Sequence, residues 1–364
     1  MDDDILRVGL SFLKLIGEYM HYNSIKLQIW RCFNVTTLMI AIWFTTLNLG
    51  HAAGAGYMKT IEGVSTLIHI LLKYLFIINN KSRIENILDD RSKFWNYKNF
   101  QGKVSRRIKI RFTFVKFAQR YLISTMFFVV FMYWLRPYLD QSARFMYDCW
   151  IYPDSIVLEA IVLGCQYYTL GAAIPIVLGC DFVYFAYTFQ FASQLQLLNH
   201  EFRRITVRTT PERIYDYIKH HQFLISIFKR ISSTYFWMLL FHYIVTLATC
   251  CCQLYIVILR KAESREMLAS FIYNLALYVE FGYYAFPADI LVSELRDISN
   301  AIYSSCWYDQ DIKIQKSLLV IMMQAQRQRY MSVGGIVEMN VDTFSSVIRK
   351  TFSFYTVSKN ILNE

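Results

Sequence analysis

Charged side chains are scarce in this sequence, and that scarcity restricts the class of protein it can encode. Aspartate, glutamate, lysine and arginine make up 18% of the 364 residues, whereas 55% of the residues are hydrophobic. A soluble globule of this length needs a larger charged fraction to cover its surface. The composition therefore excludes an ordinary soluble protein and favours a polytopic membrane protein.

Proline and glycine are also few, with 5 and 13 residues, and no stretch rich in proline, glycine or serine divides the chain. Separate domains are usually joined by such linkers. We therefore expect one all-α membrane domain, in which long helices extend into a cytoplasmic anchor region.

Motifs for catalysis and for metal or cofactor binding are missing as well. The sequence has no glycine-rich phosphate loop and no paired-carboxylate motif, and its histidines are scattered apart from the adjacent His220 and His221. An active site needs a nucleophile, a base and oxyanion donors that converge, or closely spaced metal ligands. We predict no enzyme activity, no cofactor and no metal site.

The eight cysteines lack the paired spacing of metal sites, and Cys250-Cys251-Cys252 lie inside an apolar run. Buried free thiols account for most of them. Cys149 and Cys165 lie in or beside a segment that we expect outside the cell. Their spacing is compatible with a disulfide, but spacing alone does not establish the geometry that a bridge needs, and two free thiols are the favoured interpretation.

Lysine and arginine outnumber the acidic residues, 38 against 27, and they are concentrated between the apolar runs. The stretch 81–116 is the most basic of these segments, which is typical of a cytoplasmic loop. The net charge of +11 therefore indicates membrane topology, and we expect no nucleic-acid partner.

The apolar runs predict seven membrane helices with the N-terminus inside and the C-terminus outside. We expect no cleavable signal peptide, because the chain opens with acidic residues. The predicted parts are a cytoplasmic amphipathic N-terminus over 1–31, helices 1 to 6 with basic cytoplasmic loops over 32–292, a cytoplasmic anchor or assembly segment over 293–332, and a pore-lining seventh helix with a short extracellular tail over 333–364. The expected spans are 32–53, 63–78, 120–135, 161–191, 235–259, 267–291 and 333–358.

Asp181 lies inside the fourth apolar run, where an isolated carboxylate costs several kcal/mol. We expect a structural partner for it in preference to direct contact with a ligand, and the sequence leaves both open.

The last apolar run is unusually polar. Thr343, Ser346, Lys350 and Ser353 recur at helical spacing, beside an aromatic stripe that includes Phe344 and Phe352. One face of this helix can line water while the other packs on neighbouring helices. The alternative is an amphipathic terminal helix docked on a soluble domain.

The same stretch carries a resemblance to a known family. Residues 343–356 read TFSSVIRKTFSFYT, a Thr-Phe pair followed by a lysine and a run of serine, tyrosine and threonine with aromatics. This pattern resembles the C-terminal signature of the insect odorant receptors. Further positions match that family upstream: Tyr303, Trp307, Tyr308, Lys316, Leu319 and Ala325-Gln326-Arg327.

The resemblance implies an odorant receptor, the odorant-binding subunit of a ligand-gated non-selective cation channel. Its partners would be the common odorant receptor co-receptor in a hetero-tetramer, a small volatile hydrophobic ligand and membrane lipid. It would lie in the plasma membrane of the sensory dendrite of olfactory neurons. The alternatives are a gustatory receptor channel, whose Thr-Tyr and Gln-Phe signature is missing here, and a polytopic transporter.

The resemblance also implies an odorant pocket in the outer half of the bundle, between the second, third, fourth and sixth spans. Aromatic and apolar residues with a few polar groups suit a small volatile there, although most aromatics in such helices serve packing. The candidates are His69, Lys73, Phe128, Met132, Tyr133, Tyr167, Tyr168, Ile174, Tyr278 and Tyr283.

For the pore and its gate, the resemblance implies Ser353, Thr356, Val357, Lys359 and Asn360. Lys359 replaces the small apolar residue expected in the co-receptor, and four lysines at one narrow mouth would repel cations. We therefore expect a hetero-oligomer. For assembly between subunits we expect the cytoplasmic residues Trp307, Tyr308, Ile321 and Ala325, within an apolar stripe that also includes Ile298, Ile302, Leu318 and Met322.

Overall fold

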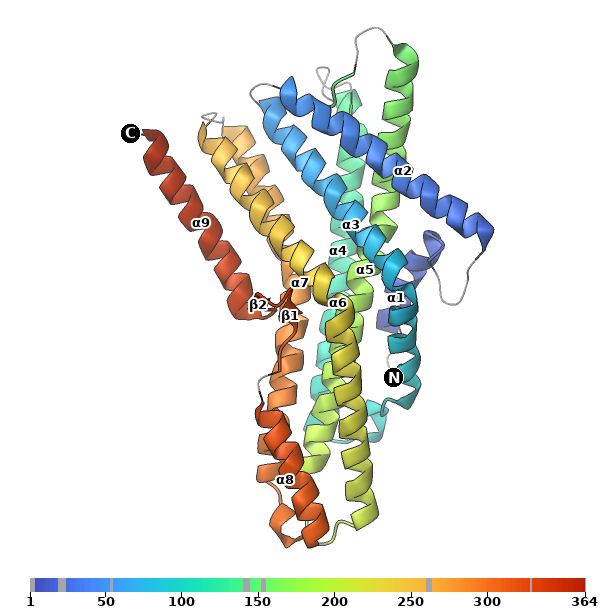
Figure 1. Ribbon diagram of the computed structural model, residues 1–364, viewed down its shortest axis with the longest axis vertical. Helices are drawn as coiled ribbons and strands as arrows, with labels where there is room; N and C mark the ends of the chain where they lie inside the picture. The colour runs from blue at the N-terminus through green and yellow to red at the C-terminus, as the bar shows by residue number, and fades with distance from the viewer. Residues whose placement is uncertain are drawn as a thin grey trace.

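The computed structural model describes residues 4–18, 24–52, 55–139, 145–151, 155–259, 264–327 and 329–363, and α-helices account for most of these residues (Figure 1). The helices are α1 (Asp4–Leu15), α2 (Ile25–Leu47), α3 (Ala55–Asp89), α4 (Lys103–Leu139), α5 (Ile156–Arg203), α6 (Pro211–Leu259), α7 (Ser264–Tyr303), α8 (Ile312–Gln326) and α9 (Val341–Asn363). Two short strands, β1 (Ser332–Val333) and β2 (Val337–Glu338), precede α9.

Six of the described helices are long and apolar enough to cross a membrane, and they correspond to α2 through α7. The all-α membrane class predicted from the apolar runs is confirmed. The apolar runs form parts of longer helices, and α5, α6 and α7 continue well beyond their apolar runs. The polar residues of α9 keep it out of this set, although its 23 residues make a helix about 35 Å long, enough for a bilayer.

Helix α5 forms the centre of the bundle. Nearly every side chain from Ala173 to Phe202 is buried, which explains why this run is apolar on all sides. Helix α1 packs directly on α5 at Gly9, where a Cβ atom would lie 2.9 Å from the backbone nitrogen of Val183. Only glycine allows the two backbones to approach this closely.

A buried ion pair holds the end of the N-terminal segment against α2. The Arg31 guanidinium donates to both carboxylate oxygens of Glu18, over 2.5 and 2.6 Å, and the Glu18 side chain is fully buried. This two-point geometry is the strong form of an arginine–carboxylate pair. Residues 1–3 and 19–23 of the predicted N-terminal segment lie outside the described residues.

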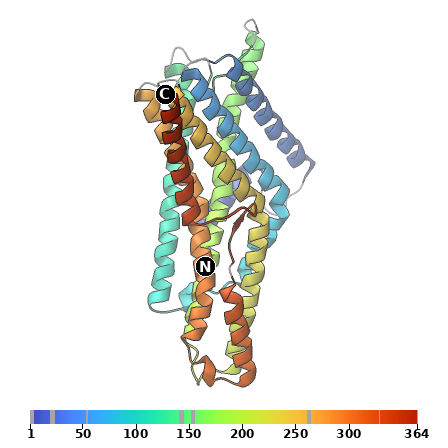
Figure 2. The ribbon, with the colours of Figure 1, turned by 60° about the vertical axis from the view of Figure 1, so that its left-hand side comes forward.

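Helices α5, α6 and α7 extend together toward one end of the molecule, where α8 folds back against α7 (Figures 1 and 2). The apolar stripe that we expected between subunits packs inside the chain here. Ile321 and Ala325 are buried, whereas Tyr308 is exposed and Trp307 is half-buried. The other side of α8 exposes Leu319, Val320 and Met323.

The seventh helix begins at Val341, later than the residue 333 expected from the sequence, because a β-hairpin occupies the intervening stretch. Ser332 pairs with Glu338 and Val333 with Val337. Gly334 in the turn has φ +60°, which favours glycine, and it lies against Leu240 of α6. The hairpin therefore fixes the base of α9 to α6.

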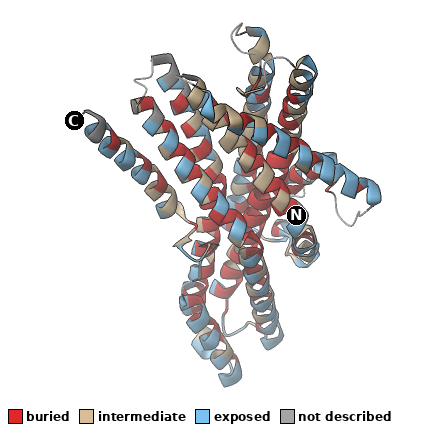
Figure 3. Ribbon diagram, turned by 45° about the horizontal axis from the view of Figure 1, so that its top comes forward, coloured by how far each residue is buried: buried red, intermediate tan, exposed pale blue. Residues whose placement is uncertain are grey.

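Helix α9 lies at the edge of the bundle (Figures 1 and 3). It contacts α6 and α7, with Val347, Thr351 and Ser358 buried on that side. On the remaining surface Phe352 and Val357 are more than half exposed.

Candidate functional site

A cavity of about 190 Å³ lies within the bundle and is lined by α3, α4, α5, α6 and α7. Its wall is mostly apolar, with a few hydroxyl groups and two carboxylates at one end. Such a lining suits a small, mainly apolar molecule oriented by one or two polar contacts. The apolar wall includes Leu122, Met126, Val130, Leu170, Ala173 and Val177, and the polar wall includes Ser65, Thr66, Tyr133, Tyr147, Thr249, Tyr273, Asp181 and Glu280.

Three hydroxyl groups of the wall are held together by hydrogen bonds between α3 and α7. The Tyr273 hydroxyl lies 3.0 Å from the hydroxyls of both Ser65 and Thr66. These contacts hold three polar side chains together at the cavity wall.

One end of the cavity is closed by the segment before α5. Gln166 of α5 accepts from the Met146 backbone nitrogen over 3.0 Å and donates to the Tyr147 carbonyl over 3.0 Å, and Arg136 of α4 donates to Asp148 over 2.6 Å. These side chains hold Tyr147 over the cavity, so the closing segment is built into the fold.

At the opposite end lies a buried charged cluster formed by Lys73 of α3, Asp181 of α5 and Glu280 of α7. The Lys73 ammonium donates to Asp181 Oδ1 over 2.6 Å and also to Glu280 Oε1, and the Tyr284 hydroxyl donates to the same Asp181 oxygen. Lys73 and Asp181 are fully buried. The structural partner expected for Asp181 is confirmed, and it is Lys73.

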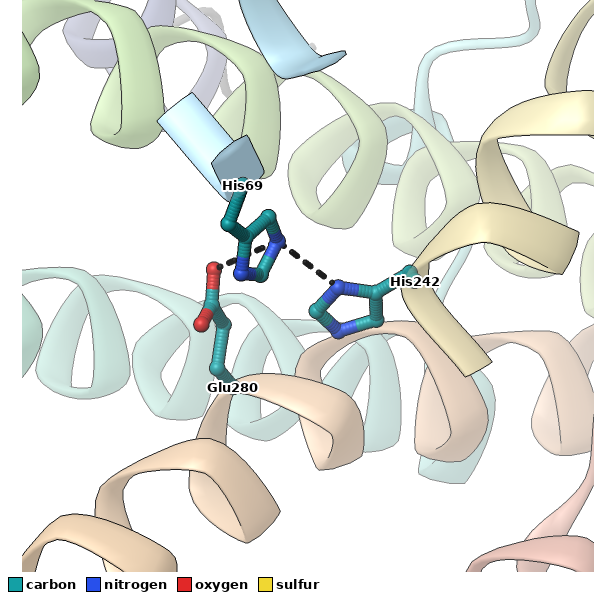
Figure 4. Close-up of side chains that lie close together, drawn as sticks. All are labelled: His69, His242 and Glu280. Carbon is teal, nitrogen blue, oxygen red and sulfur yellow. Dashed lines mark hydrogen bonds and ion pairs between the residues drawn. The ribbon is translucent and has the colours of Figure 1, made fainter. Parts of the chain in front are cut away.

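Two histidines extend this cluster toward α6 (Figure 4). His69 Nε2 lies 3.0 Å from His242 Nδ1 and 3.6 Å from Glu280 Oε1. The ligand-type atoms of the three residues lie within 4.8 Å of one another, close enough to share a metal ion. The Lys73 ammonium already occupies the same Glu280 oxygen, and its charge opposes a divalent ion there.

A second hollow of about 460 Å³ lies between α3 and α6 and is also lined by His69, Lys73 and His242. Trp237 and Phe241 form its outer wall and are exposed on the surface of the bundle. His69 thus lines both spaces.

The structure brings together only some of the residues that the sequence suggested for an odorant pocket. His69 and Tyr133 line the cavity, and Lys73 lies at its charged end. Tyr168 bonds Asn34 on α2, and Tyr283 donates to the Ala118 carbonyl. The remaining candidates do not line the cavity. Phe128 and Met132 are exposed, and Tyr167 bonds the Trp134 carbonyl. Ile174 is buried in the core, and Tyr278 packs at the edge of the core.

The five residues suggested for the pore all lie in α9. Ser353, Thr356, Val357, Lys359 and Asn360 are exposed on the side turned away from α6 and α7. None of them contributes to the cavity wall described above.

Glu280, Tyr147 and Gln166 are site residues that sequence reasoning missed. Glu280 carried a usable signal, because it is a carboxylate inside an apolar run, as Asp181 is. Tyr147 and Gln166 meet only through the tertiary fold, and no local pattern marks them.

The fold resembles that of a solved insect receptor. The structure of the olfactory receptor OR5 from Machilis hrabei in complex with eugenol superposes with a TM-score of 0.77, covering 99% of this chain and 98% of that chain at 14% identity. A second structure of the OR5 receptor from Machilis hrabei superposes with a TM-score of 0.77, covering 98% of this chain and 97% of that chain.

Sequence relatives point the same way. Odorant receptor 10 of Aedes albopictus is 20% identical over 92% of both chains. Odorant receptor 49a of Drosophila melanogaster is 22% identical over a stretch that covers 40% of this chain and 37% of that relative's length. A family model described as the 7tm odorant receptor matches residues 56–352, which is most of the sequence. The chain therefore belongs to the 7tm odorant receptor family.

Proposed function

We propose that this odorant receptor is the ligand-binding subunit of a ligand-gated, non-selective cation channel. The observation that carries the proposal is that the cavity and α9 share a supporting helix. Val245 and Thr249 of α6 line the cavity, while Tyr243 of the same helix accepts a hydrogen bond from Lys350 of α9 over 3.2 Å. A ligand that favours one position of α6 therefore favours one position of α9.

The ligand is a small volatile molecule held mainly by shape. Apolar side chains from α4 and α5 form most of the wall, and Tyr133, Tyr273 and His69 supply the polar contacts. The eugenol held by the Machilis receptor is a small aromatic molecule, which supports a ligand of this class.

The working channel is a hetero-tetramer with the common co-receptor. Helix α9 exposes Lys359 on the side away from its own bundle. Four copies of such a helix around one pore would repel cations, whereas dilution by co-receptor subunits would lower that repulsion. The exposed apolar side of α8 supplies a contact surface for a partner subunit.

The chain would lie in the plasma membrane of the sensory dendrite with its N-terminus inside. The basic stretch 81–116 and the α5–α6 connection would then face the cytoplasm, as the distribution of lysine and arginine predicts.

Whole-cell current tests the proposal. Cells would express this chain alone, the co-receptor alone, or both, and a panel of volatiles would be applied. We expect a ligand-evoked cation current that is specific to co-expressing cells and absent from cells with the co-receptor alone. Robust current from this chain alone would overturn the need for a partner. Silence toward every volatile despite surface expression would count against the channel.

A further inference from the structure

The charged end of the cavity holds more negative than positive charge. Lys73 is the one cationic side chain in contact with two carboxylates, Asp181 and Glu280. Among the described residues that line the cavity there is no lysine or arginine. With both carboxylates ionised and the imidazoles neutral, the cluster carries one excess negative charge inside the bundle.

One carboxylate oxygen of the cluster has no hydrogen-bond donor among the described residues. The Lys73 and Tyr284 donors both bind Asp181 Oδ1, so Asp181 Oδ2 is buried without a hydrogen-bond partner. Asp181 and Glu280 both line the cavity, and the Glu280 side chain keeps 18% of its area accessible there. A buried acceptor of this kind costs free energy unless a donor reaches it.

Beside the Tyr284 hydroxyl and the Cys180 thiol, the titratable groups at this end include His69 and His242. Their nitrogens lie 3.0 Å apart, so one must accept while the other donates, and the two rings cannot both be charged in this contact. One added proton on this histidine pair would supply the missing positive charge. Protonation of the pair is therefore the alternative to binding of a cationic ligand.

From this geometry we propose that the cavity takes small protonated amines, with the ammonium group bound at the Glu280 carboxylate, beside Asp181. The proposal rests on the cavity being the ligand site, as proposed above. An ammonium donates up to three hydrogen bonds and cancels one negative charge, whereas an alcohol of the same shape supplies one hydrogen bond and no charge.

The rest of the wall fits such a ligand. Tyr133, Tyr147 and Tyr273 line the same cavity, and aromatic faces attract organic cations. A cavity of roughly 150 Å³ is known to hold benzene. The volume of about 190 Å³ therefore suits a single ring with a short aminomethyl arm, as in benzylamine.

The decisive experiment compares benzylamine with benzyl alcohol, which has the same shape without the charge. The purified full chain in nanodiscs would be heated with increasing concentrations of each compound, and the shift in midpoint temperature would give an apparent Kd. This readout does not depend on channel opening. We expect benzylamine to bind at least tenfold more tightly than benzyl alcohol.

The Glu280→Gln variant removes one charge while keeping the shape, and it should reduce that preference at least tenfold without weakening benzyl alcohol. The matched control is Glu294→Gln on the same helix, which removes a carboxylate that pairs with Arg111 outside the cavity. The control should keep the full preference.

Equal binding of amine and alcohol by the wild-type chain would overturn the inference, because a proton on the histidine pair would then balance the charge. A preference that survives in Glu280→Gln would overturn it as well. Preferential binding of benzylamine without any current in co-expressing cells would count against the channel and leave the amine site standing.

Discussion

Lys73 is the residue on which the charged cluster depends. It is fully buried and contacts two carboxylates that come from different helices. Removing one partner from a buried ion pair leaves an uncompensated charge, which costs far more than the pair contributes when it is intact. The lysine therefore acts as a structural bond between α3, α5 and α7.

Replacing Lys73 with methionine should lower the free energy of unfolding by about 3 to 5 kcal/mol. The double variant Lys73→Met with Asp181→Asn restores the original net charge of the cluster and should recover part of that loss. Thermal unfolding of the purified chain in detergent measures both. Lys109→Met, at an exposed position of α4, is the control and should leave the midpoint unchanged. Equal midpoints for wild type and Lys73→Met would contradict the structural role.

Cys149 lies in the segment that closes the cavity, and all eight cysteines, including Cys165, are free thiols in the structure. Burial, assisted by the Asp148 carboxylate, raises the pKa of the Cys149 thiol to about 12. The thiolate is the reactive form, so raising the pKa lowers reactivity at neutral pH.

Maleimide labelling of Cys149 at pH 7.5 should therefore be about a thousandfold slower in the folded chain than in the denatured chain. Because the pKa lies far above this pH, the rate should rise about tenfold for each unit between pH 7 and 9. Peptide mass spectrometry would follow the reaction, with Cys149→Ser to assign the labelled peptide. Fast labelling of the folded chain would show that the thiol is not buried as described.

At the scale of the elements, hydrophobic runs and basic segments were sufficient to identify α2 through α7. They did not give the lengths of the helices. Polar stretches such as the C-terminal part of α5 are buried against α6 and α7, and this burial keeps them helical although their hydropathy is low. The hairpin before α9 was missed since strands of two residues leave no alternating pattern. Asp181 was singled out from the sequence, but its partner lies 108 positions away and depended on the fold.

The hairpin gives a prediction at this scale. Gly334 has a positive φ, and a Cβ atom there would lie 2.6 Å from Leu240. Gly334→Ala should therefore cost about 1 to 3 kcal/mol in unfolding free energy and weaken the ligand-evoked current. Gly164→Ala in α5, where a Cβ atom meets nothing within 4 Å, is the matched control and should keep both stability and current. An unchanged current in Gly334→Ala would remove the hairpin from the coupling between cavity and pore.

At the scale of the whole molecule, the apolar stripe that was expected between subunits is used within the chain, and another surface is left uncovered. Leu319 and Met323 are four residues apart on α8 and are both exposed, 46% and 59%. Apolar side chains on one exposed helix face are typical of a contact with a partner.

Replacing both Leu319 and Met323 with aspartate should abolish co-purification with the co-receptor, because a desolvated carboxylate opposes the contact. The variant should keep the thermal stability of the isolated chain, since neither side chain is buried within it. Gln324→Asp, exposed on the neighbouring face of α8, is the control and should still co-purify. Normal co-purification of the double variant would assign assembly to another surface.

Helix α6 touches the cavity at Val245 and Thr249, the hairpin through Leu240 and α9 through Tyr243, all within about three turns. When two ligand sites bias the same element, thermodynamics requires the influence to be equal in both directions. A blocker that traps α9 in one position should therefore change the affinity of the cavity for its odorant. The odorant should change the affinity of the receptor for the blocker by the same factor. If α9 lines the pore as proposed, a receptor built in this way can be adjusted from its pore as well as from its pocket.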